Sequence, residues 1–230
     1  MYNKLNTLNI NLTEEKKELF DKYISLFLNY NENVNLISNN DSKVLFEKHI
    51  FDSLAMNLFL TNKKIKVLDI GTGGGFPSIP LALVFDEMQI SAVDSINKKI
   101  NFINHAKSEL NINNIKPICS RVEDLPENLK NSFDIVTTRA MADLREILEY
   151  AIPYTKVGGY FIAYKSLKAN EELDNAKNAL KSLNAVLIDK IEYNLPIEEN
   201  NSRVLLIFKK NKNVLDCYPR KNGLVKKKPL

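Results

Sequence analysis

The chain has 230 residues, of which 44% are hydrophobic and 26% charged, an ordinary balance for a globular protein that argues against intrinsic disorder. No stretch approaches the roughly 18 apolar residues of a membrane span, and the first residues lack the apolar run of a secretory signal. The two cysteines, Cys119 and Cys217, lie far apart in the sequence and cannot form a disulfide framework or a zinc site. We therefore expect a cytoplasmic protein with no membrane segment and no metal.

The net charge of +4 is distributed unevenly. From Lys209 onward the chain carries eight basic residues and one acid, a local charge of +7, whereas the preceding part carries −3. A mildly acidic body with a cationic tail indicates an anionic partner, most commonly nucleic acid. A tail that only improves solubility is the alternative, and charge alone does not separate the two.

Two helical patterns come first along the chain. Apolar residues recur at helical spacing over residues 13–30, where Thr13 is the expected N-cap, and again over Asp41–Leu60. Strand-like runs then alternate with helical patterns, of which Ser95–Leu110 is the clearest. The strand-like runs are Ile65–Ile70, Gln89–Asp94, Ile115–Ser120, Phe133–Arg139, Gly159–Lys165, Ala185–Tyr193 and Arg203–Lys209.

This alternation predicts an α/β fold with a doubly wound, mostly parallel sheet. The last two strands have no room for a helix between them, so they should pair antiparallel. Seven strands ending in an antiparallel pair are typical of a class I S-adenosylmethionine-dependent methyltransferase, a Rossmann-like fold. We expect residues 1–62 to form a helical extension packed on a core of residues 63–210, with residues 211–230 as a basic tail.

A glycine-rich loop, Asp69-Ile70-Gly71-Thr72-Gly73-Gly74-Gly75-Phe76-Pro77, follows the first strand and precedes a helix. Glycines allow the backbone to turn sharply and approach a ligand, which points to Gly71, Gly73 and Gly75. A dinucleotide-binding loop would have a glycine at position 76, but the chain has Phe76. Asp69 would repel a pyrophosphate but suits S-adenosylmethionine, which has an ammonium, a sulfonium and no phosphate.

A second carboxylate, Asp94, ends the next strand. At this position it can accept hydrogen bonds from both ribose hydroxyls of a nucleoside cofactor. The alternative is an aspartate that only caps the helix starting near Ser95. Position, spacing and residue type together favour ribose binding.

Two motifs that the sequence lacks narrow the choice of methyl acceptor. The region after the fourth strand, Thr137–Ala140, contains neither a cysteine nucleophile nor an Asp/Asn-Pro-Pro-aromatic loop, and Cys119 is expected to be a buried apolar residue. These absences favour a nucleophile that needs little deprotonation, such as a ring nitrogen. Nitrogen and oxygen atoms of small molecules stay open as acceptors.

Two arginines, Arg121 and Arg139, end the third and fourth strands, where open α/β sheets bind ligands. Either could pair with the cofactor carboxylate or an RNA phosphate, and a surface ion pair is the alternative for each. His49 and Asp52 share one helix face. We interpret them as a surface hydrogen bond, and their roles stay open.

The chain resembles the bacterial small-subunit rRNA guanine-N7 methyltransferases of the RsmG type, also called glucose-inhibited division protein B. The resemblance covers nearly the whole chain, and its motifs are specific in combination. They are Asn35-Leu36, His49-Ile50-Phe51-Asp52-Ser53-Leu54, Asp69–Pro80, Asp94-Ser95 with Lys98-Lys99, Ser120-Arg121-Val122-Glu123, Arg139-Ala140-Met141-Ala142, Lys165, Arg203 and Tyr218-Pro219-Arg220-Lys221-Asn222-Gly223.

The resemblance implies methylation of guanine N7 in the 530 loop of 16S rRNA, in the small ribosomal subunit, by a monomer. The implied reaction needs no general base. Arg139 and Lys165 are candidates for positioning the substrate. The implied cofactor contacts are Gly71, Phe76, Asp94, the Val122–Glu123 pair and Arg139. Residues expected to face RNA are Arg121, Lys165, Arg203, Arg220, Lys221, Lys226, Lys227 and Lys228.

The chain departs from the family pattern at two positions. Ser78 replaces a common glycine after Phe76-Pro77, and Ser166 replaces the usual glycine after Lys165. The second departure bears on the backbone geometry that directs Lys165. Two other functions fit parts of the sequence, a small-molecule methyltransferase and a non-catalytic RNA-binding protein on the same fold.

Overall fold

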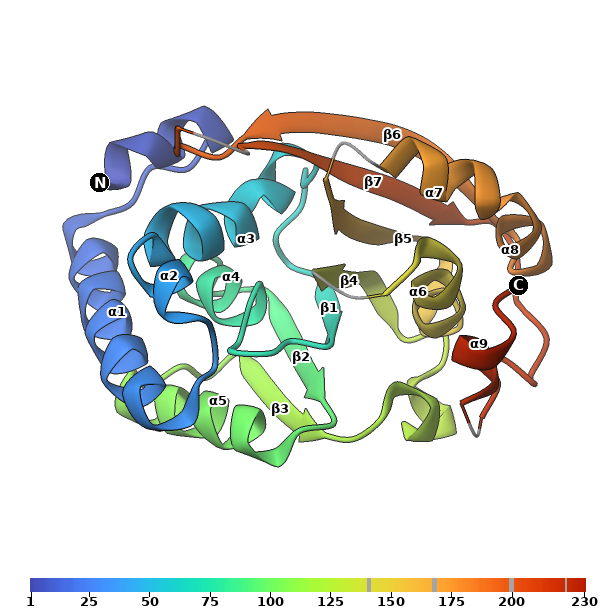
Figure 1. Cartoon of the computed structure of the whole chain (residues 1–230), viewed down its shortest axis with the longest axis horizontal. Coiled ribbons are helices and arrows are strands. Elements are labelled where there is room, and N and C mark those ends of the chain that lie inside the picture. Colours follow the sequence, from blue (N-terminus) through green and yellow to red (C-terminus); the bar gives the residue numbers. More distant parts are fainter. Residues whose placement is uncertain (140–141, 167–168, 199–200, 222) are drawn as a thin grey trace.

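The computed structural model describes residues 1–139, 142–166, 169–198, 201–221 and 223–230. Ala140, Met141 and Asn222, which belong to motifs quoted above, lie outside these residues. In the described part, a sheet of seven strands has the order β3-β2-β1-β4-β5-β7-β6 (Figure 1). The strands are β1 (Lys66–Ile70), β2 (Gln89–Asp94), β3 (Ile115–Cys119), β4 (Phe133–Arg139), β5 (Thr155–Lys165), β6 (Ala185–Asn194) and β7 (Ser202–Lys210).

The direction of the strands confirms the prediction of a mostly parallel sheet. β1 pairs parallel with β2 and β4, whereas β7 lies between β5 and β6 and pairs antiparallel with both. The chain progresses outward from β1 to β3 and then returns to place β4 on the other side of β1. This reversal creates a switch point between β1 and β4, where open α/β sheets bind ligands at the carboxyl ends of the strands.

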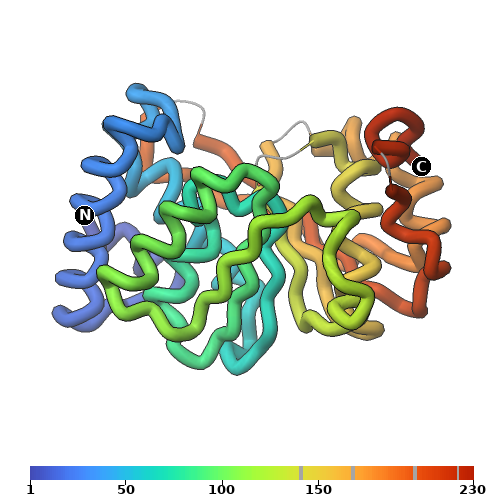
Figure 2. The backbone as a smooth tube through the Cα atoms, turned by 90° about the horizontal axis from the view of Figure 1, so that it is seen from below, coloured from blue at the N-terminus to red at the C-terminus, as the bar shows by residue number. Residues whose placement is uncertain are grey.

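Helices cover both faces of the sheet, because its strands are apolar on both sides. On one face, α1 (Glu14–Val34), α4 (Ser78–Val84) and α5 (Asn97–Glu109) pack together, with the rings of Phe27 and Phe102 5.2 Å apart. The other face is covered by α6 (Leu144–Ala151), α7 (Ala169–Asn175) and α8 (Lys177–Ser182). The sheet is therefore the middle layer of three, as the two views show (Figures 1 and 2).

The N-terminal helices belong to the first of these layers. The 3₁₀ helix η1 (Tyr2–Leu8) and α1 bury Leu5, Phe20 and Tyr23 completely against the core. The hydroxyl of Thr13 accepts a hydrogen bond from the amide of Lys16 at 3.3 Å, which confirms the predicted N-cap. No helix in the described residues is long and apolar enough to cross a membrane.

The single helix predicted for Asp41–Leu60 is wrong. The segment is divided into α2 (Asn39–Ser42), a π-helical turn η2 (Phe46–Phe51), α3 (Asp52–Leu54) and the 3₁₀ helix η3 (Ala55–Leu58). Side chains of the sheet compete for its backbone carbonyls: Arg139 donates to the Lys48 oxygen at 3.1 Å, and Tyr164 donates to the Ser53 oxygen at 2.7 Å. A regular helix pattern cannot reveal such tertiary bonds.

The second correction concerns Cys119, which is exposed and not buried as expected. It ends β3, and β3 is the outermost strand at its end of the sheet. A residue of an edge strand is covered on fewer sides than one in the middle of the sheet.

Candidate cofactor and substrate site

The glycine-rich loop connects β1 to α4 at the switch point. The amides of Gly71 and Thr72 donate to the carbonyl of Val93 at 2.9 and 3.0 Å, so the loop is fastened to the end of β2. Gly75 has a φ of +88°, and a Cβ there would lie 2.5 Å from the Ile79 side chain. Only glycine fits this position, because both the backbone conformation and the packing exclude a side chain.

Asp94 connects the glycine loop with the helix that follows β2. One carboxylate oxygen accepts a hydrogen bond from the Gly73 amide at 3.0 Å, and the other accepts one from the Ile96 amide at 2.9 Å. Lys99 lies 3.4 Å from the first of these oxygens. Asp94 therefore holds both the glycine loop and the turn before α5. It does not cap that helix, because the N-cap is Ile96 and no side chain bonds the first helical amides.

A cavity of about 410 Å³ opens beside these residues. At its other end, the carbonyl of Val122 accepts a hydrogen bond from the Tyr154 hydroxyl at 2.6 Å, which fixes the turn η4 (Val122–Asp124). The cavity thus brings together several of the predicted residues from separate strand ends. Its lining is Gly71, Val93, Asp94, Ser95, Ile96, Lys99, Ser120, Arg121, Val122, Glu123 and Tyr150.

Asp69 does not line this cavity, although the sequence suggested that it meets the ligand. Its side chain is fully buried beneath the loop and accepts a hydrogen bond from the Ser78 hydroxyl at 2.6 Å. Burial raises the pKa of Asp69 to about 7, and the bonds from Ser78 and Thr72 offset only part of that effect. Ser78, noted above as a departure from the family pattern, is therefore the residue that holds this carboxyl.

Arg139, at the end of β4, lies in a buried polar cluster next to the glycine loop. Its guanidinium donates to the Asp52 carboxylate at 2.9 Å and contacts Nδ1 of His49 at 2.7 Å. It also lies over the ring of Phe76, 5.3 Å from the ring centroid. Tyr193, from β6, donates to the second Asp52 oxygen at 2.6 Å.

His49 is an acceptor in this cluster, since arginine can only donate. Burial, followed by the charge of Arg139, lowers the pKa of His49 to about 3 and keeps the ring neutral. His49 and Asp52 are both buried, which corrects the interpretation of a surface hydrogen bond. Sequence reasoning also missed Tyr193, because only the tertiary fold brings β6 to this place.

A second cavity, of about 470 Å³, opens at the same edge of the sheet on the side of β4, β5 and β7. Lys165 ends β5, and its ammonium lies 2.7 Å from Glu172 and 3.0 Å from the Ala142 carbonyl. Arg203, in β7, donates to the Ser202 carbonyl at 2.9 Å. The cavity is lined by Asp41, Lys48, His49, Asp52, Arg139, Tyr164, Lys165, Ser166, Glu172 and Arg203.

The remaining residues predicted to face RNA differ in their exposure and in their partners. The Arg121 side chain is 69% exposed at the rim of the first cavity. In the tail, the lysines predicted to face RNA are exposed, but Arg220 is paired with the buried Glu149 at 2.6 Å. An RNA contact by Arg220 would therefore require this ion pair to open. The exposed lysines that were predicted to face RNA are Lys221, Lys226, Lys227 and Lys228.

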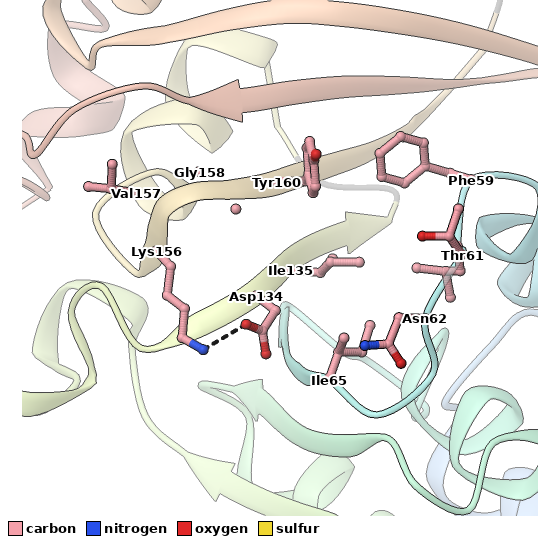
Figure 3. Close-up of a pocket in the computed structure, with 12 residues that line it drawn as sticks. Phe59, Thr61, Asn62, Ile65, Asp134, Ile135, Lys156, Val157, Gly158 and Tyr160 are labelled. Carbon is pink, nitrogen blue, oxygen red and sulfur yellow. Dashed lines mark hydrogen bonds and ion pairs between the residues drawn. The ribbon is translucent and has the colours of Figure 1, made fainter.

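Another cavity, of about 510 Å³, contains none of the predicted residues (Figure 3). It lies at the opposite edge of the sheet, where β1, β4 and β5 begin. Phe59 and Tyr160 form an edge-to-face pair there, and Lys156 pairs with Asp134 at 2.6 Å, as the dashed line in Figure 3 marks. Ligands of doubly wound sheets bind at the other edge, so this cavity is not part of the site.

The strand order, the glycine loop and Asp94 define the class: a class I S-adenosylmethionine-dependent methyltransferase fold. Among solved structures, the chain is similar to M. jannaschii TYW2 in complex with AdoMet, with a TM-score of 0.57 and 18% identity, covering 76% of this chain and 78% of that one. It is also similar to a SAM-dependent methyltransferase from Aquifex aeolicus, with a TM-score of 0.56 and 17% identity, covering 75% and 98%.

The family follows from the sequence comparisons. Residues 16–196 match GidB, the rRNA small subunit methyltransferase G family, and the chain belongs to this family. A ribosomal RNA small subunit methyltransferase G of Streptococcus pneumoniae serotype 19F (strain G54) is 39% identical over 100% of this chain and 98% of its own length. That of Lysinibacillus sphaericus (strain C3-41) is 39% identical over 96% and 94%.

Proposed function

We propose that this protein transfers the methyl group of S-adenosylmethionine to N7 of a guanine in the 530 loop of 16S rRNA. The observation that carries the proposal is that two cavities open at the same edge of the sheet, the carboxyl edge. The first has the glycine loop and Asp94 in its wall. The second is lined by four cations, Lys48, Arg139, Lys165 and Arg203, against three carboxylates, Asp41, Asp52 and Glu172. Its small net positive charge is compatible with a negatively charged substrate.

The residues of the first cavity fit the cofactor. Gly71 forms the open wall of the loop, and Asp94 is placed to accept hydrogen bonds from ribose hydroxyls. The Val122–Glu123 pair, fixed by Tyr154, would hold the adenine. We assign Gly73, Gly75 and Phe76 to shaping the loop, and Asp69 to supporting it from beneath through Ser78.

Arg139 would hold the carboxylate of the cofactor. Asp52 and His49 fix its guanidinium, and Phe76 lies beneath it, so the group is oriented before any ligand arrives. Guanidinium groups bind carboxylates through two parallel hydrogen bonds. Such preorganisation lowers the cost of binding.

The cofactor supplies a methyl group already activated on a sulfonium. Guanine N7 has a free lone pair, so this chain has no proton to remove and the proposal needs no catalytic base. The contribution of the protein is to bring the two atoms into line and to exclude water. We assign the positioning of the nucleotide to Lys165, the cation at the end of β5, because Arg139 at the end of β4 is assigned to the cofactor.

The target base must leave its stack to reach the site, which fits recognition of a looped rather than a fully paired RNA. We propose that Arg121, Lys165, Arg203 and the exposed tail lysines contact its phosphates. The proposal includes the small ribosomal subunit as the partner, a cytoplasmic location and a monomeric enzyme. Light scattering coupled to size-exclusion chromatography measures the last of these.

The experiment supplies radiolabelled S-adenosylmethionine to unmodified small ribosomal subunits, to free 16S rRNA and to a small-molecule extract in parallel. Label in either RNA sample and none in the extract supports the proposal. Label only in the extract would support the small-molecule alternative. Binding of RNA without any transfer, although the cofactor binds, would support the non-catalytic alternative.

A further inference from the structure

The basic C-terminal segment is packed against the body of the protein rather than extended from it. Here the tail means residues 211–221 and 223–230. Val225, in the helix α9 (Leu224–Lys227), is completely buried, and Tyr218 and Leu230 pack against the core on the α6 side of the sheet. In Figure 2 the tail runs along one side of the molecule, from the end of β7 to α9.

One arginine makes the central contacts of this packing. Nε and Nη2 of Arg220 donate to the two carboxylate oxygens of Glu149 at 2.8 and 2.6 Å, and the Arg220 amide donates to the same carboxylate at 2.9 Å. Nη2 also donates to the carbonyl of Lys228 at 2.8 Å. Arg220 thus ties the far end of α9 to α6.

Glu149 is completely buried, which makes this ion pair more than a surface contact. A buried carboxylate is strongly destabilising without a partner, so the native state favours the closed pair. Glu149 precedes Tyr150, which lines the cofactor cavity. The tail is therefore fixed to the same helix that contributes to the cofactor site.

We propose that the Arg220–Glu149 pair is a latch that holds the tail as a rigid part of the RNA-binding surface, beside the cofactor cavity. In this arrangement Arg220 is a positioning residue, and the exposed lysines Lys221, Lys226, Lys227 and Lys228 contact the RNA phosphates. Fixed lysines bind without the entropy cost of ordering a flexible segment. The inference rests on the proposed function, because it requires an RNA substrate.

For the RNA affinity of a Glu149 variant, the latch predicts a change opposite in sign to the one that simple electrostatics predicts. Glu149→Gln removes a negative charge, so a tail acting only through its charge would bind RNA equally well or more tightly. If the latch is right, this variant binds unmodified small ribosomal subunits about fivefold more weakly, equivalent to about 1 kcal/mol. The matched control is Glu146→Gln on the same helix, since Glu146 makes no hydrogen bond to the tail in the described residues.

Arg220→Lys provides a second variant that keeps the charge. Lysine cannot reproduce the two-pronged contact with Glu149 together with the bond to the Lys228 carbonyl, so this variant should also bind more weakly. Limited trypsin digestion supplies a measurement without RNA. Cleavage after Lys221 and Lys226 should be faster in both latch variants than in Glu146→Gln, while affinity for S-adenosylmethionine, measured by calorimetry, shows that the core has folded.

The outcomes separate the latch from the proposed function. Weaker binding with faster tail cleavage and unchanged cofactor affinity supports the latch. Binding and cleavage equal to those of Glu146→Gln overturn it. Failure of the unaltered protein to bind or methylate the subunits would overturn the proposed function instead.

Discussion

Asp52 and Arg139 are 87 residues apart in the sequence, yet their side chains form an ion pair of 2.9 Å in which both are largely buried. One comes from the segment of short helices before the core, and the other ends a central strand. The pair joins the N-terminal region to the carboxyl edge of the sheet. It explains how Arg139 is held beside the glycine loop.

Removing the charge of Asp52 should destabilise the protein and weaken cofactor binding. Asp52→Asn leaves Arg139 partly buried without its counter-ion, and we expect a loss of about 3 kcal/mol in the free energy of unfolding. Urea denaturation measures this change. Asp174→Asn, which affects an exposed ion pair with Lys177, is the control and should leave the unfolding free energy unchanged within error. Equal stabilities of the two variants would contradict the assignment.

Replacing His49 should change how stability depends on pH. The pKa of His49 is lowered from 6.5 to about 3 in the folded state, so below pH 6.5 the unfolded chain binds more protons. The stabilisation is present above pH 6.5 and is lost as the pH falls toward 3. As the pH is lowered from 6.5 to 4, His49→Gln should therefore lose less stability than the unaltered protein. The exposed His105 offers His105→Gln as the control, whose profile should follow that of the parent.

Asp69 should give stability the opposite dependence on pH from that of His49. Its pKa is raised from 3.8 to about 7, so the folded protein holds a proton that the unfolded chain has released. This contribution is present below pH 3.8 and is lost as the pH rises through 7. Asp69→Asn, which can still accept the Ser78 hydrogen bond, should gain stability relative to the parent as the pH increases from 4 to 8. A constant difference across that range would show that Asp69 is ionised throughout.

Asp94 is predicted to be the main polar contact of the cofactor site. Asp94→Ala removes the expected ribose bonds and also releases the Gly73 amide. Loss of hydrogen bonds to a charged group costs about 1.5–3 kcal/mol, which corresponds to a tenfold to hundredfold weaker affinity. Isothermal titration with S-adenosylmethionine measures it, with Asp86→Ala on the surface as the control. Unchanged affinity would remove Asp94 from the site.

Local sequence patterns predicted the sheet well, because buried strands and their flanking loops leave clear signals. The antiparallel final pair followed from the short connection between β6 and β7, and the glycine loop was evident from residue types alone. The cluster around Arg139 could not be predicted in this way. His49, Asp52 and Tyr193 are polar residues whose partners lie on other elements, so their burial depends on tertiary contacts.

The C-terminal tail is a second place where the sequence could not predict the contacts of individual residues. Its charge was readable from the sequence, and Arg220 was predicted to face RNA together with Lys221, Lys226, Lys227 and Lys228. Arg220 instead pairs with Glu149, a glutamate on α6 that has no distinguishing sequence context. Only the folded structure separates the arginine that anchors the tail from the lysines that remain exposed.

Methylation of guanine N7 can be tested by mapping the modified nucleotide. Unmodified small ribosomal subunits are incubated with the protein and S-adenosylmethionine, and their 16S rRNA is then treated with borohydride and aniline, which cleave at 7-methylguanosine. We expect one new cleavage, in the 530 loop, that requires both protein and cofactor. Absence of that cleavage, or methyl incorporation at another atom or another position, would contradict it.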